Sequence, residues 1–116
     1  MDYKRGDIVL VDFNPQKRAQ EIAKVRPAVI VSDSALNEVL DLVSVVAMTT
    51  NLIDDAAPLR IRIEPRQNLK HASDAMVEQL RSVAKSSIRE RIAVVTSEEM
   101  QLIEEGICQV LAVHCP

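Results

Sequence analysis

The run Ala28–Val31 constrains the fold of this chain more than any other part of the sequence. It holds four consecutive apolar residues, three of them branched at Cβ, and such a run is typical of a buried β-strand. The preceding Pro27 lacks a backbone N–H and keeps Arg26 extended, which suits the first position of a strand. The sequence therefore predicts a strand over 26–32 with Arg26 at its entrance. A cation fixed there can meet an anion, although a solvated strand-end arginine is the simpler alternative.

Other short strands are predicted along the chain, separated by turns. Residues 7–13, after Gly6, have the pattern of a strand with one fully buried face, and further strands are predicted over 40–50, 59–64, 76–83 and 92–95. A turn is predicted at 33–34, a short helical turn over 86–91, and loops over 16–24 and 51–57. Segment 59–64 alternates, so three side chains are expected to face the core (Leu59, Ile61, Ile63) and three to face water (Arg60, Arg62, Glu64).

The C-terminal segment is the clearest helix. Thr96 can cap it, and Glu99 three residues later completes a capping box. Behind this start, apolar residues recur at helical spacing and are expected to pack on the core: Met100, Ile103, Ile107, Val110 and Leu111. Several short strands and one terminal helix predict a mainly β fold, namely a small, curved antiparallel barrel with a C-terminal helix, in a single domain over 1–116.

Composition narrows the class of protein. A chain of 116 residues suits one hydrophobic core, and its only aromatic residues are Tyr3 and Phe13. No apolar run approaches the roughly 20 residues that a membrane span needs. Cys108 and Cys115 form neither a secreted-type disulfide framework nor a four-cysteine zinc site, so we expect them to be packing residues. A reduced, cytoplasmic protein is the simplest interpretation.

The distribution of charge is uneven. The net charge of −3 argues against indiscriminate binding of nucleic acid. Basic residues nevertheless gather in segments 1–26 and 59–91, while acidic residues gather over 33–55 and 98–105. If folding brings the two basic segments together, they form a groove for an anionic ligand. A merely solvated basic face is the alternative.

Conventional catalytic groups are sparse. His71 and His114 are the only histidines, and nothing in the sequence indicates that they meet at one phosphate. The adjacent acidic pairs at 54–55 and 104–105 direct their carboxylates apart rather than onto one metal ion. With two glycines the chain has no glycine-rich phosphate loop, and it has no nucleophile elbow. The sequence thus predicts neither a hydrolase triad nor a metallonuclease, and no metal ligand or cofactor.

Several segments together resemble a known family. The chain contains, in this order, Gly6–Pro15, Glu21, Val25–Ser32, Met48–Thr50 and Val77–Val83. This ordered set, which spans nearly the whole chain, is similar to that of the MazF/PemK toxins, bacterial endoribonucleases of type II toxin–antitoxin systems. The resemblance implies a Src-homology-three-like barrel, a homodimer and metal-independent cleavage of single-stranded RNA. It also implies neutralisation by a small antitoxin of the MazE type, whose C-terminal tail lies along the RNA-binding surface.

The resemblance also implies roles for individual residues. Arg26 matches the family's catalytic arginine, Thr49 its catalytic threonine, and Glu21 a loop glutamate linked to activity. Substrate contacts are expected from Asn14, Lys17, Arg18, Thr50, Asn51, Gln79 and Arg81. In such a site the 2′-hydroxyl of RNA is the nucleophile, the guanidinium clamps the phosphate, and Glu21 acts either as a general base or as a positioning residue. The products are a 2′,3′-cyclic phosphate and a 5′-hydroxyl.

One departure from the family concerns the loop before Arg26. The family usually has a glycine shortly before the glutamate and another between it and the arginine, where this chain has Arg18-Ala19-Gln20 and Lys24. Loops 14–25 and 51–58 are the expected readers of RNA bases, so this departure concerns sequence preference. Two other functions stay open: a toxin that poisons gyrase, whose class needs a tryptophan that this chain lacks, and a catalytically silent RNA-binding barrel.

Overall fold

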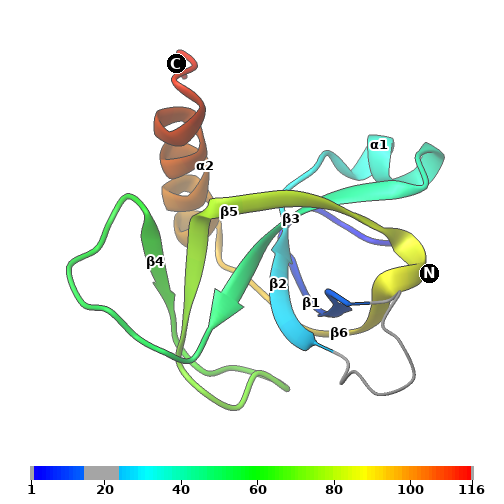
Figure 1. Ribbon diagram of the computed structural model, residues 1–116, viewed down its shortest axis with the longest axis horizontal. Helices are drawn as coiled ribbons and strands as arrows, with labels where there is room; N and C mark the ends of the chain where they lie inside the picture. Colours follow the sequence, from blue (N-terminus) through cyan, green and yellow to red (C-terminus); the bar gives the residue numbers. More distant parts are fainter. Residues whose placement is uncertain (1, 15–23, 116) are drawn as a thin grey trace.

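A curved antiparallel sheet and a C-terminal helix organise the computed structural model, which describes residues 2–14 and 24–115 (Figure 1). The elements in chain order are β1 (Asp7–Asp12), β2 (Val25–Ile30), α1 (Ser34–Val39), β3 (Leu42–Thr49), β4 (Arg60–Ile63), β5 (Ser73–Ala84), the short 3₁₀ helix η1 (Lys85–Ser87), β6 (Ile88–Val94) and α2 (Ser97–Leu111). Within the described part of the chain the strand order is β4-β5-β3-β2-β1-β6, and every neighbouring pair is antiparallel. The predicted mainly β fold with a terminal helix is confirmed.

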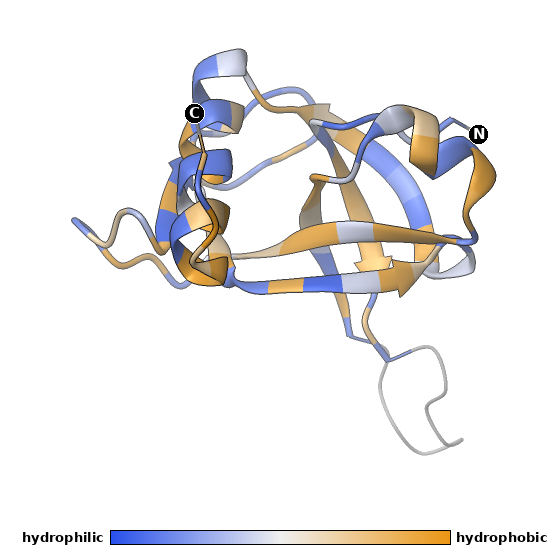
Figure 2. Ribbon diagram, turned by 90° about the horizontal axis from the view of Figure 1, so that it is seen from above, coloured by the Kyte–Doolittle hydropathy of each residue, from blue (hydrophilic) through white to orange (hydrophobic). Residues whose placement is uncertain are grey.

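The sheet is buried on both faces. On one face, residues such as Ile8, Val46 and Val77 pack with Met100 and Ile103 of helix α2. On the other face the curled sheet packs on itself, and its cluster consists of Val9, Val11, Ala28, Ile30, Val43, Val45, Val83 and Ile88. Strand β1 contributes to both clusters, so the prediction of one buried face for it was too narrow. The strands accordingly carry long hydrophobic stretches in Figure 2.

Segment 33–39 differs from the prediction. It was expected to turn directly into a strand, but Ser34–Val39 forms helix α1, and β3 begins only at Leu42. The Asp33 carboxylate caps this helix by accepting the backbone N–H groups of Ala35 and Leu36, at 2.8 and 3.4 Å. A helix of 6 residues gives too little periodicity to be recognised from sequence, and its aspartate cap has the same composition as a turn.

Three further boundaries moved. Strand β5 begins at Ser73 rather than at residue 76, and residues 88–91 belong to strand β6 rather than to a helical turn. Leu59 lies before β4 and is 47% exposed, so its predicted core position was wrong, whereas Ile61 and Ile63 are buried as predicted. Arg62 was expected to face water, but it is partly buried and paired with acidic residues.

Helix α2 begins as predicted. Thr96 Oγ1 accepts the N–H of Glu99 at 3.1 Å, and Thr96 N–H donates to Glu99 Oε1 at 2.8 Å, which completes the capping box. Gly106 lies so close to the β3–β4 connection that a Cβ atom there would stand 2.5 Å from the Pro58 carbonyl oxygen. Only the first half of the predicted apolar stripe is buried, because the helix projects beyond the sheet and exposes Val110 and Leu111 (Figure 1).

The two cysteines also differ from expectation. They were expected to be packing residues, but Cys108 and Cys115 form a disulfide, with their Cα atoms 6.1 Å apart. The disulfide joins the last turns of α2 to the segment that follows the helix. None of the described helices is long and apolar enough to cross a membrane.

Glu99 supplies a prediction about stability. Its carboxylate accepts two hydrogen bonds from Arg66, at 2.6 and 2.7 Å, in addition to the capping bond. Burial raises the pKa of Glu99, but the bonds from Arg66 and Thr96 outweigh it, so the pKa lies below its ordinary value. A carboxylate whose pKa is lower in the folded than in the unfolded state stabilises the fold at any pH above its unfolded pKa of about 4.3. This contribution is lost as the pH falls through the pKa of the folded state.

We therefore expect Glu99→Gln to have a lower free energy of unfolding than the wild type at pH 7. The difference in free energy of unfolding between the two proteins should become smaller as the pH is lowered. Urea unfolding of both proteins from pH 7 to pH 3 measures this difference. A gap that stays constant over that range would contradict the role of the Glu99 charge.

Candidate functional site

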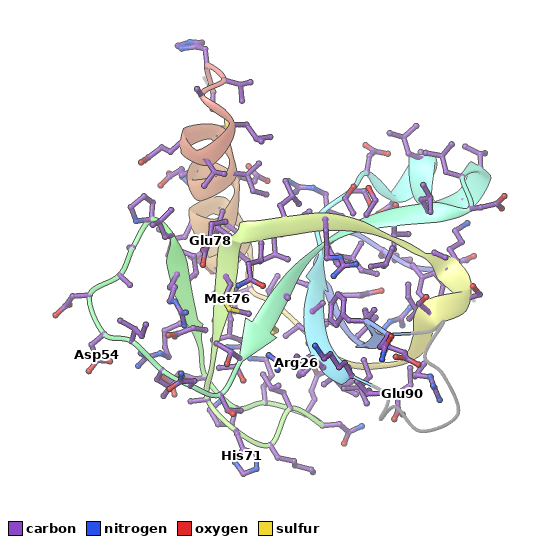
Figure 3. All side chains as sticks on the ribbon, in the orientation of Figure 1. Arg26, Asp54, His71, Met76, Glu78 and Glu90 are labelled. Atoms are coloured by element: carbon purple, nitrogen blue, oxygen red, sulfur yellow. A yellow bond between two sulfur atoms is a disulfide. The ribbon has the colours of Figure 1, made fainter. Side chains whose placement is uncertain are left out.

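A small open cleft of about 250 Å³ lies between the end of β1, the start of β2, the last part of β3 and the middle of β5. Figure 3 places Arg26 at the start of β2 and Met76 on the neighbouring part of β5. The described residues that line the cleft are Phe13, Lys24, Arg26, Ala47, Met76, Gln79 and Arg81. Four larger clefts, of about 360 to 790 Å³, lie elsewhere on the described part of the chain and are not lined by Arg26.

The register of the strands explains this arrangement. Val11 of β1 pairs with Arg26 of β2, and Ala28 of β2 pairs with Ala47 of β3. Continuing the second ladder by two residues sets Arg26 opposite Thr49 at the end of β3. Alternate residues of a strand share a face, so Thr49 lies on the same face as Ala47, which lines the cleft. The sheet thus brings the predicted arginine and threonine to one edge.

The arginines of the cleft differ from the other described arginines in that they form no ion pair with a described acidic residue. Six of the eight arginines in the described residues form ion pairs with aspartate or glutamate: Arg5, Arg60, Arg62, Arg66, Arg89 and Arg91. The other two are Arg26 and Arg81, and neither forms an ion pair with a described acidic residue. Both are exposed and both line the cleft. The cleft therefore concentrates positive charge that none of the described acidic residues neutralises.

This pairing changes the interpretation of the two basic segments. They do not merge into one large groove, because most arginines of 59–91 are neutralised by carboxylates. Arg89 pairs with Asp12 and Arg91 with Asp7, both across the β1–β6 edge, while Arg66 pairs with Glu99. Among the described arginines, those without an acidic partner are found at the cleft.

Phe13 and Arg81 form the floor of the cleft. The Arg81 guanidinium carbon lies 5.1 Å from the centre of the Phe13 ring, within the range of a cation–π contact. This contact holds the guanidinium without neutralising it. A stacked guanidinium also offers a flat surface on which a nucleotide base can stack.

Thr49 is oriented by the backbone that follows it. Its Oγ1 accepts the N–H of Asn51 at 3.1 Å. Because a hydroxyl group can accept and donate at once, the hydroxyl hydrogen of Thr49 can be directed to an incoming phosphate oxygen.

The structure brings together only part of the predicted site. Arg26, Gln79 and Arg81 line the cleft, whereas Thr49 is not a lining residue and stands two residues after Ala47, which is one. The remaining described residues lie at the adjoining chain ends: Asn14 directly after Phe13, with its N–H donated to Asp12, and the exposed Thr50 and Asn51 directly after β3. Glu21, Lys17 and Arg18 lie outside the described residues, so their predicted roles stay predictions.

Sequence reasoning missed some lining residues. Met76 lines the cleft but was not predicted as a site residue, and Lys24, which lies in the loop 14–25 expected to read RNA bases, was not itself predicted as a substrate contact. Lys24 stands two residues before Arg26 and so shares its face in an extended chain, which was a usable signal. Among the described residues, no three His, Cys, Asp or Glu side chains lie together as a possible metal site.

The fold and the cleft define a class of protein: a small, curved β-sheet with a terminal helix and an open cleft lined by two arginines that form no ion pair with a described acidic residue. The model of the family described as PemK-like, MazF-like toxin of type II toxin–antitoxin system matches residues 4–111. The chain belongs to this family, so the predicted resemblance is confirmed.

Individual relatives agree with this placement. A curated protein, Endoribonuclease MazF of Staphylococcus saprophyticus, is 26% identical over 112 residues, which cover 96% of this chain and 92% of the relative. The solved MazE–MazF (Form-II) of Deinococcus radiodurans has a TM-score of 0.81 at 20% identity and covers 98% of this chain and 99% of its own. Mycobacterium tuberculosis toxin MazF-mt6 has a TM-score of 0.78 at 14% identity and covers 94% and 99%. At these identities, the structural matches establish the fold.

Proposed function

We propose that this toxin is an endoribonuclease that cleaves single-stranded mRNA at the Arg26 cleft. The observation that carries the proposal is the pairing of the arginines: the two that form no ion pair with a described acidic residue both line this cleft. The name of the Staphylococcus relative, Endoribonuclease MazF, supports the same activity.

The reaction needs no protein nucleophile. The 2′-hydroxyl of the nucleotide before the cleavage point attacks the adjacent phosphorus, so a 2′-O–P bond forms while the P–O5′ bond breaks. The 2′-hydroxyl loses its proton to a base, and the departing 5′-oxygen gains one. The products are a 2′,3′-cyclic phosphate and a 5′-hydroxyl end.

Arg26 and Thr49 have chemistry suited to this reaction. A guanidinium is planar, carries a charge at any relevant pH and can bind two phosphate oxygens at once. It therefore stabilises the negative charge that grows on the phosphate in the transition state. The Thr49 hydroxyl donates to a further oxygen. Glu21 serves as the base or positions the substrate, and Gln79 and Arg81 contact the adjoining nucleotides together with Lys17, Arg18, Asn14, Thr50 and Asn51.

The partners follow from the same chemistry. Single-stranded RNA is the substrate, since its bases are open to the exposed side chains around the cleft. An acidic C-terminal tail of a small MazE-type antitoxin would compete for the same arginines. Solved relatives include MazE–MazF from Deinococcus radiodurans and an endoribonuclease in complex with its cognate antitoxin from Mycobacterial species. A homodimer in the cytoplasm, where mRNA and the antitoxin are found, completes the proposal.

The test is cleavage of a long single-stranded RNA by the purified protein in EDTA, with the ends of the products mapped. We expect discrete cuts with 2′,3′-cyclic phosphate and 5′-hydroxyl ends, while a duplex of the same sequence resists. An RNA that stays intact would overturn the proposal. Binding without cutting would instead indicate the catalytically silent RNA-binding barrel.

A further inference from the structure

Asp74 is a buried carboxylate on β5, directly opposite Thr49 on the neighbouring strand β3. The two residues are direct partners in the β3–β5 ladder, and Asp74 also pairs with Arg62 in the β4–β5 ladder. Directly opposed residues share a face, with Cβ atoms about 4.5–5.5 Å apart. Arg62, Asp74 and Thr49 therefore form one row across three strands, and continuing the β2–β3 register adds Arg26 to this row. Asp74 is only 1% exposed.

The Asp74 carboxylate holds the chain that follows Thr49. Its Oδ2 accepts the N–H of Ile53 at 2.8 Å, and its Oδ1 accepts the Nε–H of Arg62 at 2.6 Å. The same Arg62 reaches Asp54 at 2.8 Å, on the outer side of the connection (Figure 3). Asp74 is thus joined to the segment 50–59 both directly and through an arginine.

Two further contacts hold the same segment. Arg60, whose Nη1 lies 3.8 Å from the Asp74 carboxylate, donates to the carbonyl oxygen of Asn51 at 3.2 Å. At the other end of the segment, the Pro58 carbonyl faces Gly106 of helix α2. Asn51 is the residue whose N–H binds Thr49 Oγ1, so the network that starts at Asp74 ends on the hydroxyl of Thr49.

Electrostatics favours the charged form of this carboxylate. Burial alone would raise the pKa of Asp74, but the hydrogen bonds from Arg62 and Ile53 and the positive charges of Arg62 and Arg60 hold it below its ordinary value. A buried carboxylate is tolerated when such partners satisfy its oxygen atoms. The pairing also keeps Arg60 and Arg62 occupied, so these arginines do not compete with the cleft for phosphate.

We propose that Asp74 is a positioning residue, which fixes the Thr49 hydroxyl and segment 50–59 beside the Arg26 cleft. The role rests on the proposed endoribonuclease function. Asp74 has no contact with the reacting atoms. It acts by fixing the end of β3, and through Ile53 and Asn51 it also fixes the loop that is expected to read RNA bases.

Asp74→Asn tests this role with little change of shape. An asparagine that keeps its oxygen toward Ile53 directs an NH₂ group at Arg62, where donor meets donor, so Asp74 loses its link to the segment through Arg62. Misplacement of a catalytic group by about 1 Å can cost about 100-fold in rate, and we expect kcat to fall by about 10- to 100-fold. The distribution of cut sequences should broaden as well. A loss of folded protein lowers the rate but cannot change where RNA is cut.

Asp7→Asn is the matched control. Asp7 is also a buried carboxylate, only 4% exposed, that accepts one backbone N–H, from Lys4, and one arginine Nε–H, from Arg91 at 3.0 Å. It stands at the opposite end of β1 from Val11, the partner of Arg26. Both bonds fall on Oδ2, so an asparagine with its oxygen in that position keeps them, and the variant removes a buried charge away from the cleft. It should keep the wild-type pattern of cut sequences. Identical cutting patterns for both variants and the wild type would overturn the proposal.

Hydrogen exchange separates this proposal from the proposed function. We expect the amides of segment 50–59 to exchange faster in Asp74→Asn than in Asp7→Asn, whether or not the protein cuts RNA. If the wild type is inactive, the endoribonuclease proposal fails, and equal exchange in the two variants would then overturn the anchoring role too. Should Asp74→Asn fail to fold, Arg62→Gln, which alters a partly exposed side chain, replaces it in the same comparison.

Discussion

Arg26→Ala is expected to lower the rate of RNA cleavage by about 10²- to 10³-fold, the range found when one preorganised donor to a transition-state oxyanion is removed. The reason is the state of the guanidinium. Arg26 is exposed, lines the cleft and forms no ion pair with a described acidic residue, so its charge is available to the phosphate. Since it stands at the entrance of β2 and not in the core, the free energy of unfolding should change little.

Two companion variants sharpen this prediction. Arg26→Lys keeps the charge but loses the planar fork, so we expect a rate between those of the wild type and Arg26→Ala. Arg5→Ala removes an exposed arginine on the other side of the molecule, where it pairs with Glu104 at 2.7 Å, and should cut like the wild type. Single-turnover cleavage of a short RNA measures all three. If Arg26→Ala cleaves RNA at the wild-type rate, the cleft is not the site of cleavage.

The elements that sequence predicted best are those whose signal is local. Ala28–Ile30 is fully buried because a β-branched run with a proline before it suits a strand and little else. The capping box at Thr96 formed because two residues three apart satisfy each other's backbone groups without help from the rest of the fold. The position of Arg26 at a strand entrance followed from Pro27 in the same way.

The rest depends on contacts between distant segments. Sequence cannot show which basic residues are neutralised, because the partners are distant in the chain: Arg89 pairs with Asp12 and Arg66 with Glu99. Pattern alone therefore suggested two basic blocks, whereas most of the described arginines are paired with carboxylates and the two without such a pair line one small cleft. Asp74 was not predicted as a site residue because its role depends on contacts with Ile53 and Arg62, which lie elsewhere in the sequence.

Helix α2 shows a second limit. Its apolar stripe continues along the sequence to Leu111, so periodicity predicted that the whole stripe packs on the core. The sheet ends before the helix does, and Val110 and Leu111 stay exposed. Periodicity identifies the face of a helix that is apolar, but the length over which a partner covers it is a property of the fold.

Thr49→Val should also reduce cleavage strongly, by about 10²-fold, while leaving the fold intact. Valine has the same branched shape as threonine but no hydroxyl, so the end of β3 keeps its packing. Two hydrogen bonds are affected: the one that Thr49 Oγ1 accepts from Asn51 at 3.1 Å, and the one that its hydroxyl would donate to the phosphate. Because the second strengthens as negative charge grows on the phosphate in the transition state, we expect the loss chiefly in kcat rather than in KM.

Thr49→Ser and Ser44→Ala test whether the hydroxyl at this position is the cause. Serine restores the hydroxyl and should recover most of the rate, at some cost in stability from the lost methyl group. Ser44 lies on the same strand but an odd number of residues away, hence on the opposite face, and its deletion should leave cleavage unchanged. If Thr49→Val cuts as fast as Thr49→Ser, the hydroxyl has no part in the reaction. The transition state would then be stabilised by Arg26 without it, and Asp74 would have no catalytic group to position.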